Sequence, residues 1–299
     1  MSVDLDERAA DDGTEPIVDD AELRRWLWTL AGLIGHVLMT KIVYSDRLRR
    51  WRSNGPLTAA SELLWQLLPP RTFATGRVVV SAILEPPGYV AGDAYDYNRG
   101  RRRASMTTAL AITGVRNARR AGVQDLPTIA ARADELIRQQ PGPLQFATAV
   151  LGRLDTTSGM LDYLIAGHPP PLLVRQGRVV KELAAPPRMP LGVTVQGREP
   201  AVAAREQLEP GDRLLLYADG VTEARDSHGR FFGEQRLFEL TEHAAAAEVS
   251  APETLRRLTA AVLEHQAGRL QDDATLLPVD WSADGHLRMF PTLPTELCA

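Results

Sequence analysis

Short apolar runs alternate along this chain with longer stretches in which apolar residues recur every three or four positions. The apolar runs predict strands, over residues 78–84, 146–154, 161–166, 171–175, 179–180, 213–218 and 274–279. The periodic stretches predict helices, over residues 106–120, 127–140, 233–247 and 252–267. Because strands are grouped and separated by pairs of helices, the order favours a layered α+β domain over an alternating parallel sheet.

The part of the chain before residue 69 has a different character. Residues 1–20 are acidic and predicted to be disordered, residues 21–55 look helical, and residues 56–68 form a predicted linker helix. The main domain then spans 69–281, and 282–299 form a tail. The apolar stretch within 21–55 is shorter than the roughly 20 residues that span a bilayer, so a helix packed against protein is expected there.

The composition limits which binding partners and which cellular compartment are expected. Lysine and arginine number 34 against 38 acidic residues, so the net charge of −4 gives no general attraction to nucleic acid or to an anionic membrane. The single cysteine, Cys298, excludes an intramolecular disulfide and a cysteine-based metal cluster. A reduced, cytoplasmic location is therefore expected.

Candidate chemistry lies in aspartates next to predicted strands, at Gly92-Asp93, Asp219-Gly220 and Asp272-Asp273. Several carboxylates repel one another unless a cation neutralises them, and oxygen ligands favour magnesium or manganese. Such a centre would activate water for hydrolysis without a protein nucleophile. Aspartate beside glycine also makes ordinary turns, and spacing along the chain does not bring the three pairs together.

A resemblance to a known family adds to this picture. Six segments carry it, and they are Gly92 to Tyr97, Phe146 to Ala149, Ala166 to Leu173, Pro190 to Gly192, Gly211 to Ala224 and Gln271 to Leu276. In sequence and in order, these segments resemble those of the protein phosphatase 2C-like (PPM) family, of the bacterial stage II sporulation protein E type.

The resemblance implies an αββα sandwich of two antiparallel sheets flanked by helices, here with an N-terminal helical extension. It implies a serine/threonine phosphatase with two Mn²⁺ or Mg²⁺ ions, and Asp93, Asp219 and Asp272 as metal ligands. Asp273 is expected to support these ligands, and His168 to be structural. The implied partner is a phosphorylated protein, such as an anti-sigma-factor antagonist in sigma-factor regulation.

This sequence departs from the family after Tyr97. The family has a hairpin and an Asp-x-x-Gly-His-Gly turn there, whose aspartate bridges both metals, whereas this chain has only Asn98 to Arg103 before the next helix. Loss of a shared anion is expected to weaken both metal sites, because neighbouring cations repel. The run of Arg101, Arg102 and Arg103 is expected either to be solvated or to pair with the remaining aspartates.

The departure leaves two main functions open. One is an active metal-dependent phosphatase, and the other is a pseudophosphatase that binds a phosphorylated partner without hydrolysing it. A third reading is an interaction scaffold in which residues 21–68 form a homodimer. Asp96 and Glu223 are typical of the family without an assigned role beyond hydrogen bonding, and Arg188 and Arg205 are weak candidates for holding phosphate.

Overall fold

The computed structural model describes residues 68–85, 93–96, 106–140, 145–193, 201–247, 249–268 and 270–282. The chain divides into two compact units, Met1–Gly55 and Pro56–Ala299, and every described residue lies in the second. The predicted disordered, helical and linker segments of the N-terminus, the tail beyond Ser282 and the three consecutive arginines lie outside the described residues.

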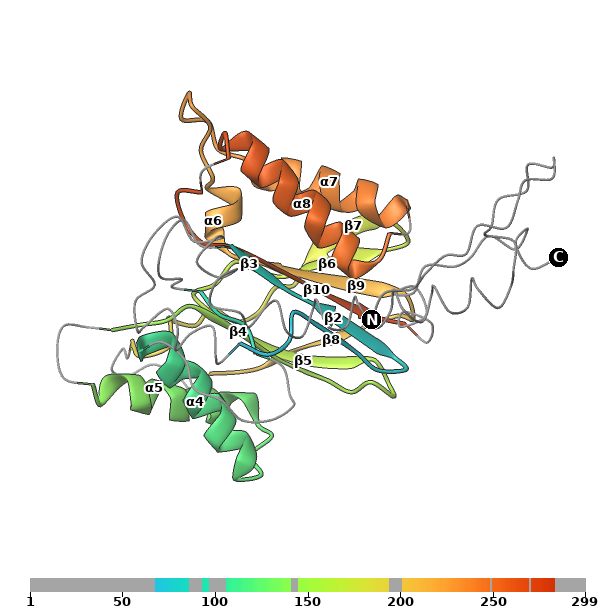
Figure 1. Cartoon of the computed structure of the whole chain (residues 1–299). Helices are drawn as coiled ribbons and strands as arrows, with labels where there is room; N and C mark the ends of the chain where they lie inside the picture. The colour runs from blue at the N-terminus through green and yellow to red at the C-terminus, as the bar shows by residue number, and fades with distance from the viewer. Residues whose placement is uncertain are drawn as a thin grey trace, which may run out of the picture. The chain divides into compact units, whose positions relative to one another are not determined.

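Two antiparallel sheets form the centre of the domain (Figure 1). The larger sheet has the strand order β1-β2-β10-β9-β6-β7, and β3 pairs with β10 beside β2. Its strands are β1 (Thr72–Ala74), β2 (Val78–Ser81), β3 (Ile83–Glu85), β6 (Leu172–Arg175), β7 (Arg178–Glu182), β9 (Asp212–Tyr217) and β10 (Ala274–Trp281). The smaller sheet has the order β4-β5-β8, from β4 (Ala149–Leu154), β5 (Met160–Ala166) and β8 (Ala204–Gln207).

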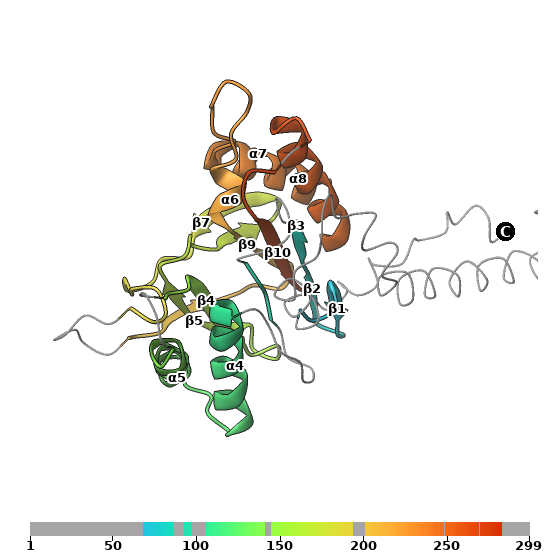
Figure 2. The same ribbon diagram turned by 60° about the vertical axis from the view of Figure 1, so that its left-hand side comes forward.

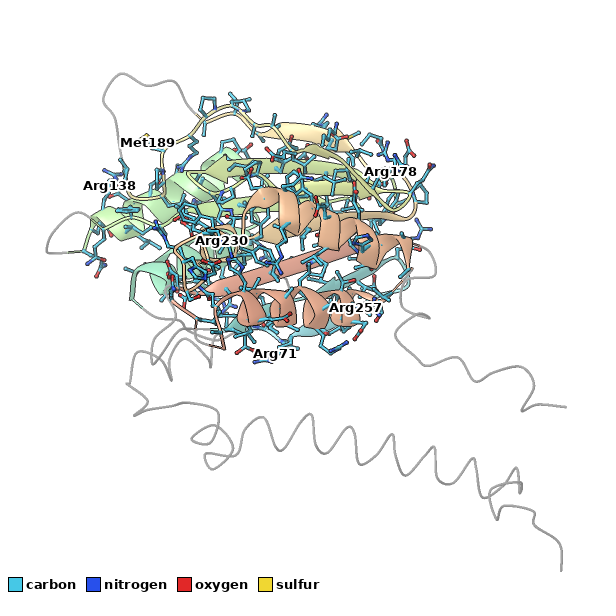
Figure 3. All side chains as sticks on the ribbon, turned by 90° about the horizontal axis from the view of Figure 1, so that it is seen from above. Arg71, Arg138, Arg178, Met189, Arg230 and Arg257 are labelled. Atoms are coloured by element: carbon cyan, nitrogen blue, oxygen red, sulfur yellow. The ribbon has the colours of Figure 1, made fainter. Side chains whose placement is uncertain are left out.

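Helices cover the outer face of each sheet (Figures 1 and 2). The helices α4 (Met106–Arg120) and α5 (Leu126–Arg138) lie on the smaller sheet. On the larger sheet lie α7 (Glu234–Ala246) and α8 (Ala251–His265), side by side in the view from above (Figure 3). The short α6 (Asp219–Thr222) follows β9 directly. This arrangement confirms the expected αββα sandwich of two antiparallel sheets.

Alternation along the strands divides the core into layers. In β9, Leu215 and Tyr217 pack in the cluster beneath α7 and α8, whereas Leu214 packs in the cluster between the sheets. In β5, Tyr163 faces the space between the sheets and Leu164 faces α4 and α5. Because successive side chains of a strand point to opposite faces, each central strand contributes to two of these clusters.

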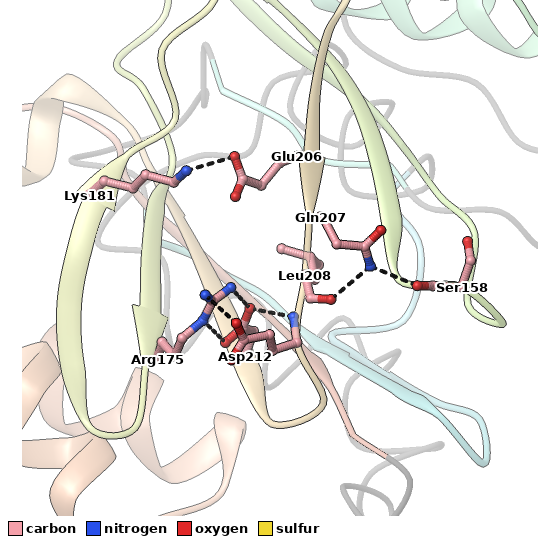
Figure 4. Close-up of polar contacts among 8 residues, drawn as sticks. Ser158, Arg175, Lys181, Glu206, Gln207, Leu208 and Asp212 are labelled. Carbon is pink, nitrogen blue, oxygen red and sulfur yellow. Dashed lines mark hydrogen bonds and ion pairs between the residues drawn. The ribbon is translucent and has the colours of Figure 1, made fainter.

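Polar contacts join the two sheets and also neighbouring strands of the larger sheet (Figure 4). Lys181 of β7 pairs with Glu206 of β8, with 2.8 Å between Nζ and Oε2, and so links the larger sheet to the smaller one. Arg175 of β6 donates to both carboxylate oxygens of Asp212 in β9, at 2.9 and 2.7 Å. The side chain of Asp212 is only 1% exposed, so this pair is the most buried of these ionic contacts.

The predicted elements agree with the structure except at a few places. Both helix pairs are present, but the predicted strand 78–84 is interrupted at Ala82, because β2 and β3 pair with different parts of β10. The strands β1 and β8 were not predicted. β8 reads Ala-Arg-Glu-Gln, which is too polar to stand out, and among the described strands it pairs with β5 alone.

Among the described helices, none combines the length and the apolar character that a membrane span requires. The predicted N-terminal helical stretch lies outside the described residues.

Candidate metal centre

Two of the predicted metal ligands meet because β9 and β10 are antiparallel neighbours. Asp219 directly follows β9 and is the first residue of α6, while Asp272 lies just before β10. Tyr217 is paired with Leu276, so the end of β9 and the start of β10 lie at the same edge of the sheet. The two aspartates, 53 positions apart in the chain (272 − 219), are thereby brought to one place.

Asp93 is tied to the same edge by two hydrogen bonds. Its backbone N–H donates to Oδ2 of Asp273 at 3.0 Å, and the hydroxyl of Thr275 donates to Oδ2 of Asp93 at 2.7 Å. Asp273 is 7% exposed, so its carboxylate supports the segment around Asp93 from inside the domain. This contact agrees with the predicted supporting role of Asp273, and Thr275 is a further residue that the sequence reasoning missed.

The pKa of Asp93 reflects first its burial and then the negative charge of its neighbours. Burial raises the pKa of Asp93 to about 6, with further increases from the carboxylates of Asp273, Asp219 and Asp272, against a lowering by the Thr275 hydrogen bond. A cation would remove the repulsion among these carboxylates. Since every donor is an oxygen, the set suits magnesium or manganese better than zinc or copper.

The carboxylates fit such a metal in their chemistry but not yet in their orientation. Oδ1 of Asp219 accepts the N–H of Gly220 at 2.9 Å, and Oδ1 of Asp272 accepts the N–H of Asp273 at 2.8 Å. Within the described part of the chain, no group of three or more carboxylate, imidazole or thiol side chains is positioned to hold one ion. In this arrangement, the described side chains do not form a complete metal site.

Gly220 sets the distance between α6 and the start of β10. A Cβ atom at this position would lie 2.2 Å from the carbonyl oxygen of Asp273 and 3.2 Å from Cβ of Asp272. A contact of 2.2 Å with backbone is far inside van der Waals distance, so any side chain here must push the two segments apart.

Gly220→Ala is accordingly expected to lower the free energy of unfolding by about 1–3 kcal/mol, the usual cost of overpacking. Thermal unfolding followed by circular dichroism measures this change. Gly76→Ala is the matched control, because a Cβ at Gly76 meets no atom within 4 Å. Equal melting temperatures for the two variants would show that the close approach at Gly220 does not exist.

His168 lies near this edge of the sheet, where its burial favours the neutral form of the ring. Burial lowers the pKa of His168, partly opposed by a hydrogen bond to the carbonyl of Pro169 and by the carboxylate of Asp219. The Nδ1 atom lies 2.9 Å from that carbonyl oxygen, which only accepts, so Nδ1 carries the proton. This local bond supports the predicted structural role, although the nearby carboxylate was not foreseen.

Asp96 has a clear structural partner. Arg116 of α4 donates to both of its carboxylate oxygens, at 2.6 and 3.1 Å, and both side chains are largely buried. Charge-assisted bidentate pairs of this kind fix geometry as well as adding stability. The pair joins α4 to the segment 93–96 and so helps to position Asp93.

Of the remaining polar candidates, the glutamate lies beside the carboxylates and the two arginines do not. Glu223 is exposed beside the carboxylates, and its backbone N–H donates to the carbonyl of Asp219 at 2.8 Å. Arg188 instead pairs with Asp134 of α5, and Arg205 pairs with Asp162 of β5 at 2.7 Å. Neither arginine therefore belongs to the carboxylate site.

Comparisons with known proteins agree with this fold. The SiaA-PP2C domain of Pseudomonas aeruginosa superposes with a TM-score of 0.57 at 23% identity, covering 68% of this chain and 86% of that one. The phosphatase domain of SpoIIE from Bacillus subtilis gives a TM-score of 0.50 at 19% identity, covering 73% of this chain and 97% of that one. The domain thus has the fold of PP2C-type phosphatase domains.

The sequence match defines the family. The family model for stage II sporulation protein E (SpoIIE) matches residues 102–282, which is more than half of the chain. This chain belongs to the SpoIIE family. It is also 30% identical to Protein IcfG of Synechocystis sp. over 159 residues, which are 52% of this chain and 24% of that protein. The match with this curated relative thus spans about a quarter of the relative's length.

Proposed function

We propose that the chain is a metal-dependent protein serine/threonine phosphatase in which Asp93, Asp219 and Asp272 hold Mn²⁺ or Mg²⁺. The observation that carries this proposal is the meeting of four aspartates from three separate segments at one sheet edge, in a member of the SpoIIE family. The raised pKa of Asp93, caused first by burial and then by its acidic neighbours, supports a site that needs a cation.

The bound metal would supply an activated water and an electrostatic clamp on the phosphoryl group. The residues of the chain position that chemistry. Asp219 and Asp272 present carboxylates from adjacent strand ends, and Asp93 is held against them by Thr275 and Asp273. This arrangement requires no side-chain nucleophile.

The proposed substrate is a phosphorylated protein, with an anti-sigma-factor antagonist as the specific candidate and the cytoplasm as the proposed location. The single cysteine and the slight negative charge support a partner bound by local contacts in a reducing compartment. A homodimer through residues 21–68 remains a separate proposal. It would give a mass by light scattering that rises with concentration, and a strictly monomeric mass would contradict it.

One alternative has specific support. The short segment after Tyr97 lacks the bridging turn of the family, and no complete ligand group is oriented for a metal within the described residues. Both observations favour a binding module that recognises a phosphorylated partner without hydrolysing it. Phosphate release from a phosphoserine peptide in manganese separates the two functions, because only the enzyme produces phosphate.

A further inference from the structure

A hydrogen-bonded hairpin, residues 224–232, joins α6 to α7 and stands out beyond α6 (Figures 1 and 2). Arg225 and Phe231 form a bridge between its two arms. At its tip, Oδ1 of Asp226 accepts two backbone N–H groups, at 2.8 and 2.9 Å. Because these bonds restrain the backbone, the exposed side chains of the hairpin are carried on a fixed support.

The two phenylalanines of the hairpin have opposite environments. Phe232 is 4% exposed and packs in the core beneath α7 and α8, whereas Phe231 is 52% exposed. Phe232 thus anchors the hairpin and leaves the ring of Phe231 outside. Aromatic and arginine side chains are enriched where proteins bind one another, and a side chain that is already held in place loses less entropy on binding.

Arg225 lies over this exposed ring and has no ion-pair partner in the described part of the chain. Its Cζ atom is 4.4 Å from the centroid of the Phe231 ring. Arg230, on the same hairpin, instead pairs with Asp226 at 2.8 Å. A guanidinium held by an aromatic ring keeps its charge for an incoming carboxylate. The hairpin therefore offers a cation and an apolar ring side by side.

The base of the hairpin contacts the segment that carries Asp272. Nε2 of Gln271 donates to the carbonyl of Arg225 at 3.1 Å. A cavity of about 160 Å³ lies here, with Glu223, Ala224, Gln271 and Asp272 in its lining. A protein whose phosphorylated residue lies at the carboxylates can therefore extend across this cavity to the hairpin.

We propose that Arg225 and Phe231 form a docking contact for the phosphorylated protein, and that this contact takes an acidic side chain next to an apolar one. The inference rests on the proposed function, because it places the phosphorylated residue at the carboxylates. The acidic side chain pairs with Arg225, and the apolar one covers the ring of Phe231. A basic segment is disfavoured, since it would meet the guanidinium with like charge.

The test uses phosphonate peptides that resist hydrolysis, titrated by calorimetry into the full chain with manganese. The reference is an alanine peptide with a phosphonomethylene analogue of phosphoserine at its centre. In a series of further peptides, one Asp-Leu pair replaces two alanines at successive positions on either side of the phosphonate. The series samples each spacing between the phosphonate and the docking contact.

Two variants remove the two halves of the contact. Arg225→Met removes the charge and keeps an unbranched side chain, and Phe231→Ala removes the ring. Arg178→Met is the control, because Arg178 is an exposed arginine on β7, away from Arg230 of the hairpin (Figure 3). All three altered positions are exposed, so the variants should keep the melting temperature of the unaltered protein.

At the best spacing, the Asp-Leu peptide is expected to bind about fivefold tighter than the alanine peptide, the size of an exposed ion pair. Arg225→Met and Phe231→Ala should each remove most of this gain and leave the affinity for the alanine peptide unchanged, whereas Arg178→Met should retain the gain. The inference is overturned if no peptide binds, if no spacing gives a gain, if either hairpin variant keeps the full gain, or if a hairpin variant weakens both peptides equally.

Hydrolysis of the matching phosphoserine peptides separates this inference from the proposed function. If no phosphate is released but Arg225→Met still removes the gain in affinity, the enzymatic function fails and the docking contact stands. If phosphate is released and no spacing gives a gain, the docking contact fails and the enzymatic function stands.

Discussion

Replacing Asp219 with asparagine is expected to lower manganese affinity by more than about a hundredfold and to abolish phosphate release. Changing a residue that only supports a metal ligand lowers metal affinity or activity about 10–100-fold. Changing a proposed direct ligand should lower metal affinity further. Asparagine has the same shape and retains an oxygen that can accept the N–H of Gly220, so the local fold of α6 should persist. The variant thus removes one negative charge with little else altered.

Glu239→Gln is the matched control for this experiment. It removes one negative charge from an exposed position on α7, outside the carboxylate cluster. Manganese affinity by calorimetry and phosphate release should be unaffected in this variant. If Asp219→Asn retains both properties at the level of the control, Asp219 is not a metal ligand.

Replacing Asp212 with alanine is expected to lower the free energy of unfolding by about 3 kcal/mol, at the low end of the range for breaking a buried ion pair because Arg175 is partly exposed. The carboxylate accepts two hydrogen bonds from Arg175 and a third from the backbone N–H of Glu209 at 2.7 Å. All three are lost together, leaving a guanidinium and a peptide N–H with fewer partners (Figure 4). Urea unfolding measures the loss.

Glu209→Ala provides the comparison within the same contact. Glu209 also pairs with Arg175, at 2.7 Å, but its side chain is 57% exposed. Exposed pairs contribute about 1 kcal/mol or less, so this variant should be nearly as stable as the unaltered protein. Equal losses in the free energy of unfolding for the two variants would show that burial does not determine how much each carboxylate partner of Arg175 stabilises the protein.

The sequence predicted the helices and strands correctly where the local pattern of apolar residues determines the structure. Both helix pairs carry clear apolar periodicity. The helix α5 also begins with a capping residue, because the side chain of Asp125 accepts the N–H of Thr128 at 2.9 Å. The strands that lie in the middle of the larger sheet are apolar enough to be recognised. β8 was missed because its polar residues resemble a loop, and only its pairing with β5 makes it a strand.

The candidate site depended more on resemblance than on pattern. Spacing alone did not place Asp93 beside Asp273, because their contact joins residues 180 positions apart. Thr275 could have been suspected, since residues two apart on a strand share a face and Asp273 lies two positions before it.

The most direct test of the account is a calorimetric titration of the purified full chain with manganese, alongside phosphate release from a phosphoserine peptide. We expect saturable manganese binding and manganese-dependent release of phosphate, as the cluster around Asp93, Asp219 and Asp272 requires if it forms a working metal centre. Absence of both binding and release would contradict the account and identify the domain as a binding module that has lost the chemistry of its family.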